Sequence, residues 1–169
     1  MADVLTHVLV GYVLGTVLSV RYAWLRPAHV TLVMIGALSP DFVKIYLLFP
    51  DGLVAALVGA PFSWDPVHTL GGNLLVLLLG TLCVSPGERR RAFSLLAAGA
   101  LTHHVLDVSL LTVTGHAYAV FWPLTAVQPP SGGLYLSSDA WPALVAGALA
   151  AATWVLRYRW LEGRDSRGQ

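Results

Sequence analysis

The chain has 169 residues, of which 56% are hydrophobic and only 11% are charged. Soluble domains are about 25% charged, so this chain has too few charges to cover a water-facing surface, and we expect an integral membrane protein. The formal net charge of +1 excludes a nucleic-acid binder that works through a basic surface. The single cysteine, Cys83, excludes a disulfide-stabilised scaffold.

Five apolar stretches are long enough to cross a bilayer as helices, which takes about 17–25 residues. They cover residues 4–20, 28–49, 66–84, 92–113 and 140–156. Between the second and third stretch, the apolar run within residues 51–64 is too short to span, which indicates an interfacial or re-entrant piece. Residues 114–139 contain several Pro, Gly and Ser residues and predict a long loop. The predicted fold class is therefore an all-α, polytopic bundle of five transmembrane helices.

The basic residues predict how these helices are oriented. With five spans, nine of the ten Lys and Arg residues fall on one side of the membrane, which the positive-inside rule assigns to the cytoplasm. The N-terminus is then outside and the C-terminus cytoplasmic. We expect one membrane-embedded domain, residues 1–160, and a short cytoplasmic tail, residues 161–169. The nine residues are Arg21, Arg26, Arg89, Arg90, Arg91, Arg157, Arg159, Arg164 and Arg167.

Ionisable side chains inside the predicted spans form a group at similar depth. With a rise of about 1.5 Å per residue, His7 and His68 lie within about 5 Å of the outer surface. Asp41 and Asp107 lie about 10 Å deep, and His103 lies about 15 Å deep. Such residues are costly in a bilayer and indicate function. Because four helices place them in the outer half of the membrane, we expect one shared site.

His103 and Asp107 are four residues apart and therefore share a helix face. An imidazole nitrogen and a carboxylate oxygen on one face can bind Zn²⁺ or Mn²⁺. The alternative is a His–Asp hydrogen bond that only stabilises the bundle. His104 lies about 100° around the helix from His103, so we expect it to support the site or to pack rather than to bind metal.

Asp41 follows the Ser39-Pro40 pair in the middle of the second span. Pro40 predicts a break in the helix, and we expect Ser39 to cap a new half-helix that presents Asp41 to a cavity. The alternative is an ion pair between Asp41 and Lys44, three residues further on. The two interpretations are compatible.

Weaker candidates surround this group. Gly11 and Gly15 form a small-residue strip that should let another helix approach closely. Asn73 is expected to make an interhelical hydrogen bond. Asp65 and His116 lie at the outer boundary, where either could complete a coordination sphere.

Short motifs in a fixed order resemble the family of inner-membrane metal-dependent hydrolases, over residues 3–123. That family is distantly similar to zinc-dependent phospholipase C and P1-type nucleases, which are all-helical phosphoesterases with several metals. The resemblance implies the ligands His7, Asp41, His68, His103 and Asp107. The family usually has a second acid where this chain has Val43, and Asp65 is the carboxylate that could replace it. The motifs are Thr6-His7, Leu38-Ser39-Pro40-Asp41, His68-Thr69, Thr102-His103-His104-Val105-Leu106-Asp107 and Gly115 followed by Phe121-Trp122-Pro123.

The expected function is metal-dependent hydrolysis of a phosphoester or a lipid-derived ester at the outer face of the cell membrane. The metal would be zinc, with manganese as the alternative, and Asp65 or Asp41 would be the general base. Expected partners are membrane lipids and a small-molecule or lipid ester substrate, and no nucleic acid. Two other functions stay open, an ion- or proton-conducting transporter and a structural membrane protein with a decayed metal site.

Overall fold

The computed structural model describes residues 3–165, with side chains up to residue 159. The described residues contain helices and loops but no β-strand, apart from isolated bridges in the loops, so the all-helical prediction is confirmed for them. The elements are α1 (Val4–Arg21), α2 (Pro27–Leu38), η1 (Ser39–Leu47), α3 (Asp51–Val58), η2 (Asp65–His68), α4 (Leu70–Leu82), η3 (Pro86–Glu88), α5 (Arg89–Val108) and α6 (Trp141–Asp165).

Within the described residues, two helices are long and apolar enough to cross a membrane. They are Val4–Arg21 and the continuous segment Pro27–Leu47, which joins α2 to η1. Leu70–Leu82 is apolar but shorter. The prediction of five spans therefore stays a prediction, although each predicted stretch contains one main helix. The first part of the predicted tail continues α6, and residues 166–169 lie outside the described residues.

The predicted end of the fourth span, at residue 113, was wrong. Helix α5 ends at Val108, because the apolar residues that follow it belong to the loop. The backbone N–H of Leu111 donates to the carbonyl oxygen of Tyr135, 2.7 Å away, instead of continuing the helix. The predicted long loop is confirmed as non-helical, and it is tied to α4 by a bond from Leu70 N–H to the Val120 carbonyl of 2.8 Å.

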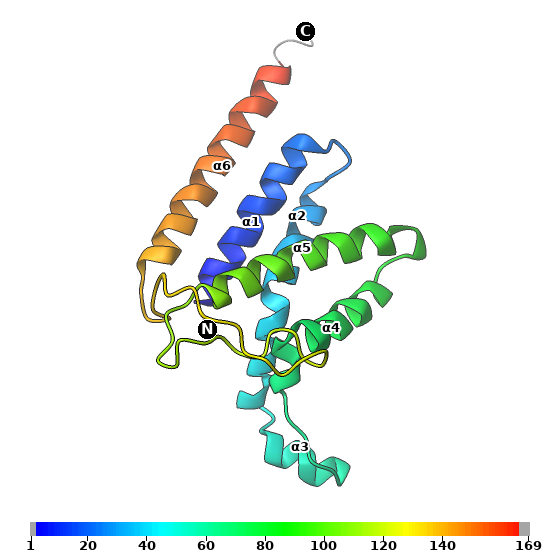
Figure 1. Ribbon diagram of the computed structural model, residues 1–169. Coiled ribbons are helices and arrows are strands. Elements are labelled where there is room, and N and C mark those ends of the chain that lie inside the picture. The colour runs from blue at the N-terminus through cyan, green and yellow to red at the C-terminus, as the bar shows by residue number, and fades with distance from the viewer. Residues whose placement is uncertain (1–2, 166–169) are drawn as a thin grey trace.

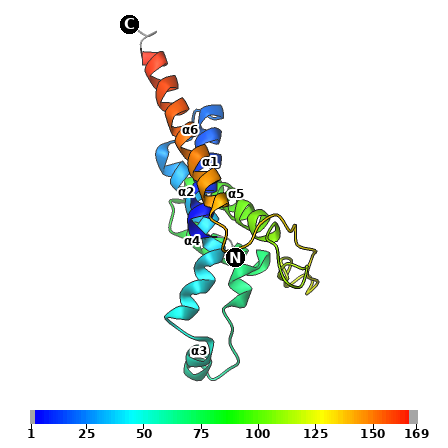
Figure 2. The same ribbon diagram turned by 90° about the vertical axis from the view of Figure 1, so that its left-hand side faces the viewer.

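Helix α2 lies at the centre of the molecule and packs against both α1 and α5 (Figure 1). Helix α6 lies along α1 and runs in the same direction, while α4 packs against α5. Helix α3 stands apart from these helices in both views (Figures 1 and 2), and none of its residues is buried.

Glycines set the close contact between α2 and α5. A Cβ atom at Gly36 would lie 2.0 Å from the carbonyl oxygen of Leu96, and one at Gly99 would lie 2.0 Å from the carbonyl oxygen of Val33. No side chain fits at either position while the two backbones stay in place. The close approach is what brings the side chains of α5 within reach of backbone atoms in α2.

A second glycine strip brings α1 close to α2, as predicted. A Cβ atom at Gly11 would lie 2.9 Å from the Cβ of Ala37, and one at Gly15 would lie 3.0 Å from a methyl group of Val30. The three helices α1, α2 and α5 therefore meet with little space between them, and this places His7 of α1 beside α5.

Polar side chains are buried beside the apolar core, and large apolar side chains are exposed. His7, His103 and Asn73 are among the largest fully buried side chains. Large apolar side chains are instead exposed on the outer faces of the helices, where a soluble protein would expose polar groups. Those on α4, α5 and α6 include Leu74, Leu75, Leu79, Leu82, Leu101, Val105, Leu144, Val145 and Leu149.

Candidate metal centre

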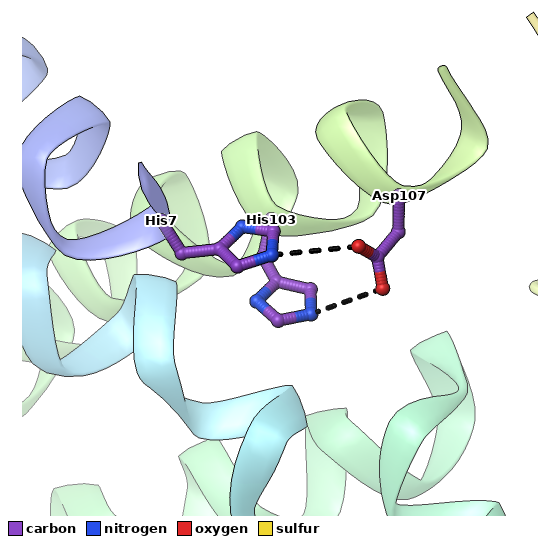
Figure 3. Close-up of side chains that lie close together, drawn as sticks. All are labelled: His7, His103 and Asp107. Carbon is purple, nitrogen blue, oxygen red and sulfur yellow. Dashed lines mark ion pairs between the residues drawn. The ribbon is translucent and has the colours of Figure 1, made fainter. Parts of the chain in front are cut away.

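Three buried side chains from two helices converge in the interior (Figure 3). His7 comes from α1, and His103 and Asp107 come from successive turns of α5. The Nε2 atom of His7 lies 3.4 Å from Oδ1 of Asp107, and Nε2 of His103 lies 3.4 Å from Oδ2. Both histidines are fully buried, and their rings stack with centroids 3.7 Å apart.

These separations fit the first coordination sphere of one ion. Nitrogen and oxygen ligands lie about 2.0–2.2 Å from zinc, so two neighbouring ligands in a tetrahedral site lie about 3.3 Å apart. A separation of 3.4 Å is longer than a good hydrogen bond, which is about 2.7–3.2 Å. The ligand atoms of His7, His103 and Asp107 all lie within 4.8 Å of one another. Buried His and Asp groups in this chain could therefore hold a metal ion.

The break at Pro40 orients His103. Helix α2 ends at Leu38 and η1 continues as a 3-10 helix, in which each N–H pairs with the carbonyl three residues earlier. In that pattern the donor for the Ala37 carbonyl would come from Pro40, which has no N–H. The Nδ1 of His103 occupies this place, 2.8 Å from the Ala37 oxygen.

His68 joins the cluster from η2, just before α4. Its Nδ1 lies 3.1 Å from the carbonyl oxygen of Pro40, and its Nε2 lies 2.8 Å from Oδ2 of Asp107. The next residue, Thr69, is the N-cap of α4, where its hydroxyl accepts a bond from the N–H of Gly72. The start of α4 thus fixes where His68 stands.

The two carbonyl contacts determine how these imidazoles face the carboxylate. A carbonyl oxygen only accepts, so Nδ1 of His68 and of His103 carries the proton. In a neutral His103 ring, Nε2 then directs a lone pair toward Asp107, 3.4 Å away, which is unfavourable unless a cation lies between them. Nε2 of His68 is 2.8 Å from Oδ2, so without a metal it must donate a second proton to the carboxylate, which only accepts. Histidines that donate their second N–H to a carbonyl are also the usual arrangement at metal sites.

Asp41 lies beside the cluster, and only one of its two carboxylate oxygens has a hydrogen-bond partner. Its Oδ2 binds Nζ of Lys44 at 2.9 Å, so the alternative of an Asp41–Lys44 ion pair is confirmed. Its Oδ1 is buried without a hydrogen-bond partner. A carboxylate oxygen of Asp41 and nitrogens of His68 and His103 also lie within 4.8 Å of one another. The ion pair and a role at the site are therefore compatible.

Ser39 does not cap a half-helix, so that prediction was wrong. Its hydroxyl donates back to the carbonyl oxygen of Gly36 at 2.7 Å and accepts from Nδ2 of Asn73 at 2.9 Å. The hydroxyl therefore closes the end of α2 rather than opening the next element. The expected interhelical hydrogen bond of Asn73 is confirmed by the same contact.

His104 lies next to the cluster and bonds outside it, as expected from its direction on the helix. Its Nδ1 is hydrogen-bonded to the phenol of Tyr118, whose ring lies 4.7 Å from that of His68. Burial raises the pKa of Tyr118 above its usual range, and the charge of Asp107 adds to this effect. Sequence reasoning missed Tyr118, because a lone tyrosine in a loop has no spacing that relates it to His68 or His104.

A cavity of about 350 Å³ opens beside His68, and its lining includes Asp65, Thr69, Tyr118 and Trp122. Asp65 thus lines the same cavity as His68, rather than belonging to either of the ligand groups found among the described residues. The exposed His116 is bonded through Nδ1 to the carbonyl of Thr114 and belongs to neither group.

Comparisons with protein-family models, with curated proteins and with solved structures found no match to this chain. The resemblance to inner-membrane metal-dependent hydrolases therefore stays a prediction. The fold and the site define an all-helical protein with two helices that could span a membrane and a buried His/Asp cluster that could hold a metal ion.

Proposed function

We propose that this chain is a multi-pass membrane protein that binds a divalent metal, zinc or manganese, and hydrolyses a phosphoester or a lipid-derived ester at the outer face of the cell membrane. The observation that carries the proposal is the cluster of His7, His103 and Asp107, with His103 oriented by the Ala37 carbonyl. A purely structural cluster would satisfy its own polar atoms at hydrogen-bond distance. Here Nε2 of His7 and of His103 reach Asp107 only at 3.4 Å, and Nδ1 of His7 has no hydrogen-bond partner.

Two features support a membrane location. Polar side chains are buried and leucines cover the outside of α4 and α6, which suits a lipid environment. Apolar side chains of α3 are also exposed, which agrees with an interfacial position outside the bundle. Helices α1 and α6 run in the same direction (Figure 1), as the first and last of five spans would. Together with the basic residues, which the positive-inside rule assigns to the cytoplasm, this leads us to propose that the N-terminus is outside and the C-terminus cytoplasmic.

In the proposed reaction, a bound divalent ion supplies Lewis acidity to the attacked group and acidifies a water molecule. Residues of the chain do the remaining work. Asp65, in the cavity lining, and Asp41, whose Oδ1 has no hydrogen-bond partner, are the two carboxylates proposed to accept a proton as general base. Tyr118 and Trp122, which line the cavity with His68, would orient the substrate there.

We rank ion or proton transport second because of where the buried ionisable groups lie. Among the described residues, the buried Asp and His side chains all lie at or beside the candidate metal centre, and they are His7, Asp41, His68, His103, His104 and Asp107. Buried polar side chains further along the helices, toward the proposed cytoplasmic end, are Thr16 and Thr81, which do not ionise at neutral pH. A proton path would need titratable groups or ordered water to continue to that end.

The proposal is tested by metal analysis of the protein purified in detergent without chelators and then loaded with Zn²⁺ or Mn²⁺. We expect retained metal and hydrolysis of at least one member of a panel of chromogenic phosphate mono- and diesters and carboxylic esters. His103→Ala should lose both, whereas His116→Ala, at an exposed histidine outside the cluster, should keep both. Wild-type protein that retains no metal would contradict the proposal.

The orientation needs its own experiment. A reporter that is active only outside the cytoplasm can be fused after Gly133 or after Arg91. We expect activity from the Gly133 fusion alone, because the loop lies outside in the proposed topology. Activity from the Arg91 fusion alone would reverse the orientation and place the candidate metal centre at the cytoplasmic face.

A further inference from the structure

A second cavity, of about 600 Å³, lies at the opposite end of the bundle from the metal centre. Its walls come from the connection between α1 and α2 and from the connection between α4 and α5, with the first turns of α2 and α5. Arg91 in its lining is separated from Asp107 by about 24 Å along α5. The cavity therefore belongs to neither the candidate metal centre nor its entrance.

The cavity holds more positive than negative charge. Arg91 binds Oε1 of Glu88 through Nη1 at 3.0 Å and lies over the ring of Trp24, 5.2 Å from its centroid. Of its N–H groups, only one on Nη1 has a hydrogen-bond acceptor within the described part of the chain. Arg26 also lines the cavity and has no carboxylate partner among the described residues. Glu88 thus balances only one of the two arginines.

His29 adds an N–H donor to this wall. The backbone N–H of Arg26 donates to its Nδ1 at 2.9 Å, so the proton of the neutral ring is on Nε2. The nearest carboxylate oxygen, Oε2 of Glu88, is 4.0 Å from that nitrogen, which is beyond hydrogen-bonding distance. The Nε2–H is therefore available to another acceptor in the cavity.

We propose that this cavity binds a phosphate group that is esterified to a small polar or lipid alcohol. Two guanidinium groups and an imidazole N–H match the several acceptor oxygens of a phosphate, which arginine binds through paired N–H donors. Leu32, Val84 and Ala92 complete the lining and give an apolar surface for the attached group. The source is the headgroup of an anionic phospholipid or a soluble phosphate ester. Only the lipid source depends on the membrane location proposed above.

The experiment measures binding to the full chain in neutral maltoside micelles, with the shift of the thermal midpoint as the signal. Phosphatidylglycerol in mixed micelles tests the lipid source, glycerol phosphate tests the soluble source, and phosphatidylcholine is the zwitterionic control. We expect saturable binding of phosphatidylglycerol or of glycerol phosphate, and whichever binds identifies the source. Arg26→Gln and Arg91→Gln should each raise Kd about tenfold, because each removes a charged hydrogen bond.

Two further variants separate a built site from general attraction to positive charge. Glu88→Gln removes the carboxylate that competes for Arg91, so it should lower Kd several-fold while leaving the fold intact by circular dichroism. The double variant Arg157→Gln/Arg159→Gln removes two charges from α6 and should leave Kd unchanged. The proposal fails if neither probe binds saturably, if the α6 variant weakens binding as much as the cavity variants do, or if Glu88→Gln weakens it.

Discussion

The Nδ1 of His103 lies 2.8 Å from the carbonyl oxygen of Ala37, although the two residues are 66 positions apart in the sequence. This contact joins the end of α2 to the C-terminal part of α5. It fixes the tautomer of His103 and directs its Nε2 toward Asp107. The position of the metal-binding nitrogen in the proposed site therefore depends on a backbone atom that the helix break leaves available.

Pro40→Ala should weaken metal binding without unfolding the protein. An N–H at residue 40 would compete with His103 for the Ala37 carbonyl, and loss of such an orienting contact typically lowers metal affinity by about 10–100-fold. Because a carbonyl oxygen has two lone pairs, we expect the lower end of this range. Chelator competition measures the affinity. Pro27→Ala, at the start of α2, is the matched control and should leave it unchanged.

His103→Ala and Asp107→Ala should each abolish metal binding, and the double variant should add little further loss, because ligands of one ion act as a unit. Asp107→Ala should stay folded, because it removes a buried charge. His104→Ala should keep most of the metal, since His104 bonds to Tyr118. A purely structural His103–Asp107 contact would give another pattern, in which stability falls by about 1–3 kcal/mol while metal content is unchanged.

Gly36→Ala and Gly99→Ala should each destabilise the protein, because the added methyl group would lie 2.0 Å from a backbone carbonyl oxygen of the facing helix. Forcing a group into a packed contact costs about 1–3 kcal/mol, and the displacement of α5 should also lower metal occupancy. Gly52→Ala, in α3, meets nothing within 4 Å and serves as the control. It should be neutral or slightly stabilising. Thermal midpoints of the three variants are measured in one detergent. If Gly36→Ala and Gly99→Ala lowered the midpoint no more than Gly52→Ala does, the backbones of α2 and α5 would not be packed as closely as the structure shows.

Stability should fall as the pH rises from about 10 to about 12. Burial, with a further contribution from the charge of Asp107, raises the pKa of Tyr135 to about 12, against about 10 for a free phenol. The folded protein holds this proton more tightly than the unfolded chain does, so the contribution is complete below pH 10 and is lost as pH approaches 12. Denaturant unfolding at several pH values between about 9 and 12 measures this change in the free energy of unfolding.

Tyr135→Phe provides the comparison for this pH dependence. The variant should lose some stability at every pH, because the phenol donates to the Leu106 carbonyl at 2.8 Å. Its stability should also fall less steeply with pH than that of the wild type above pH 10. An unchanged slope would show that another group causes the alkaline loss.

The sequence predicted which ionisable residues meet, because depth along a helix follows from residue number. His7, Asp41, His68, His103 and Asp107 were expected at similar depth, and the structure brings them together. Their role as ligands stays a prediction. The spacing of His103 and Asp107 predicted a shared helix face, and their 3.4 Å separation agrees with it.

The orienting contacts could not be predicted, because they join distant segments through atoms that every residue has. The Pro40 carbonyl meets His68 across 28 positions, and nothing in the residue types marks that oxygen as the acceptor. Ser39 was assigned to the wrong end of the break for a related reason. A serine hydroxyl beside proline can close the preceding helix or begin the next, and the amide of Asn73 stabilises the first arrangement.

The close contact of α2 and α5 at Gly36 and Gly99 affects which positions tolerate amino-acid substitution. In a water-soluble core, the largest buried side chains are the hardest to replace, since shortening them leaves a cavity. Here leucines such as Leu75 and Leu79 face outward, and other apolar residues of different size can replace them. The least replaceable positions should be those with no side chain, because each added atom widens the spacing of α2 and α5 one helical turn from His103. Along these helices, the outward-facing leucines should therefore tolerate substitution better than Gly36 and Gly99 do.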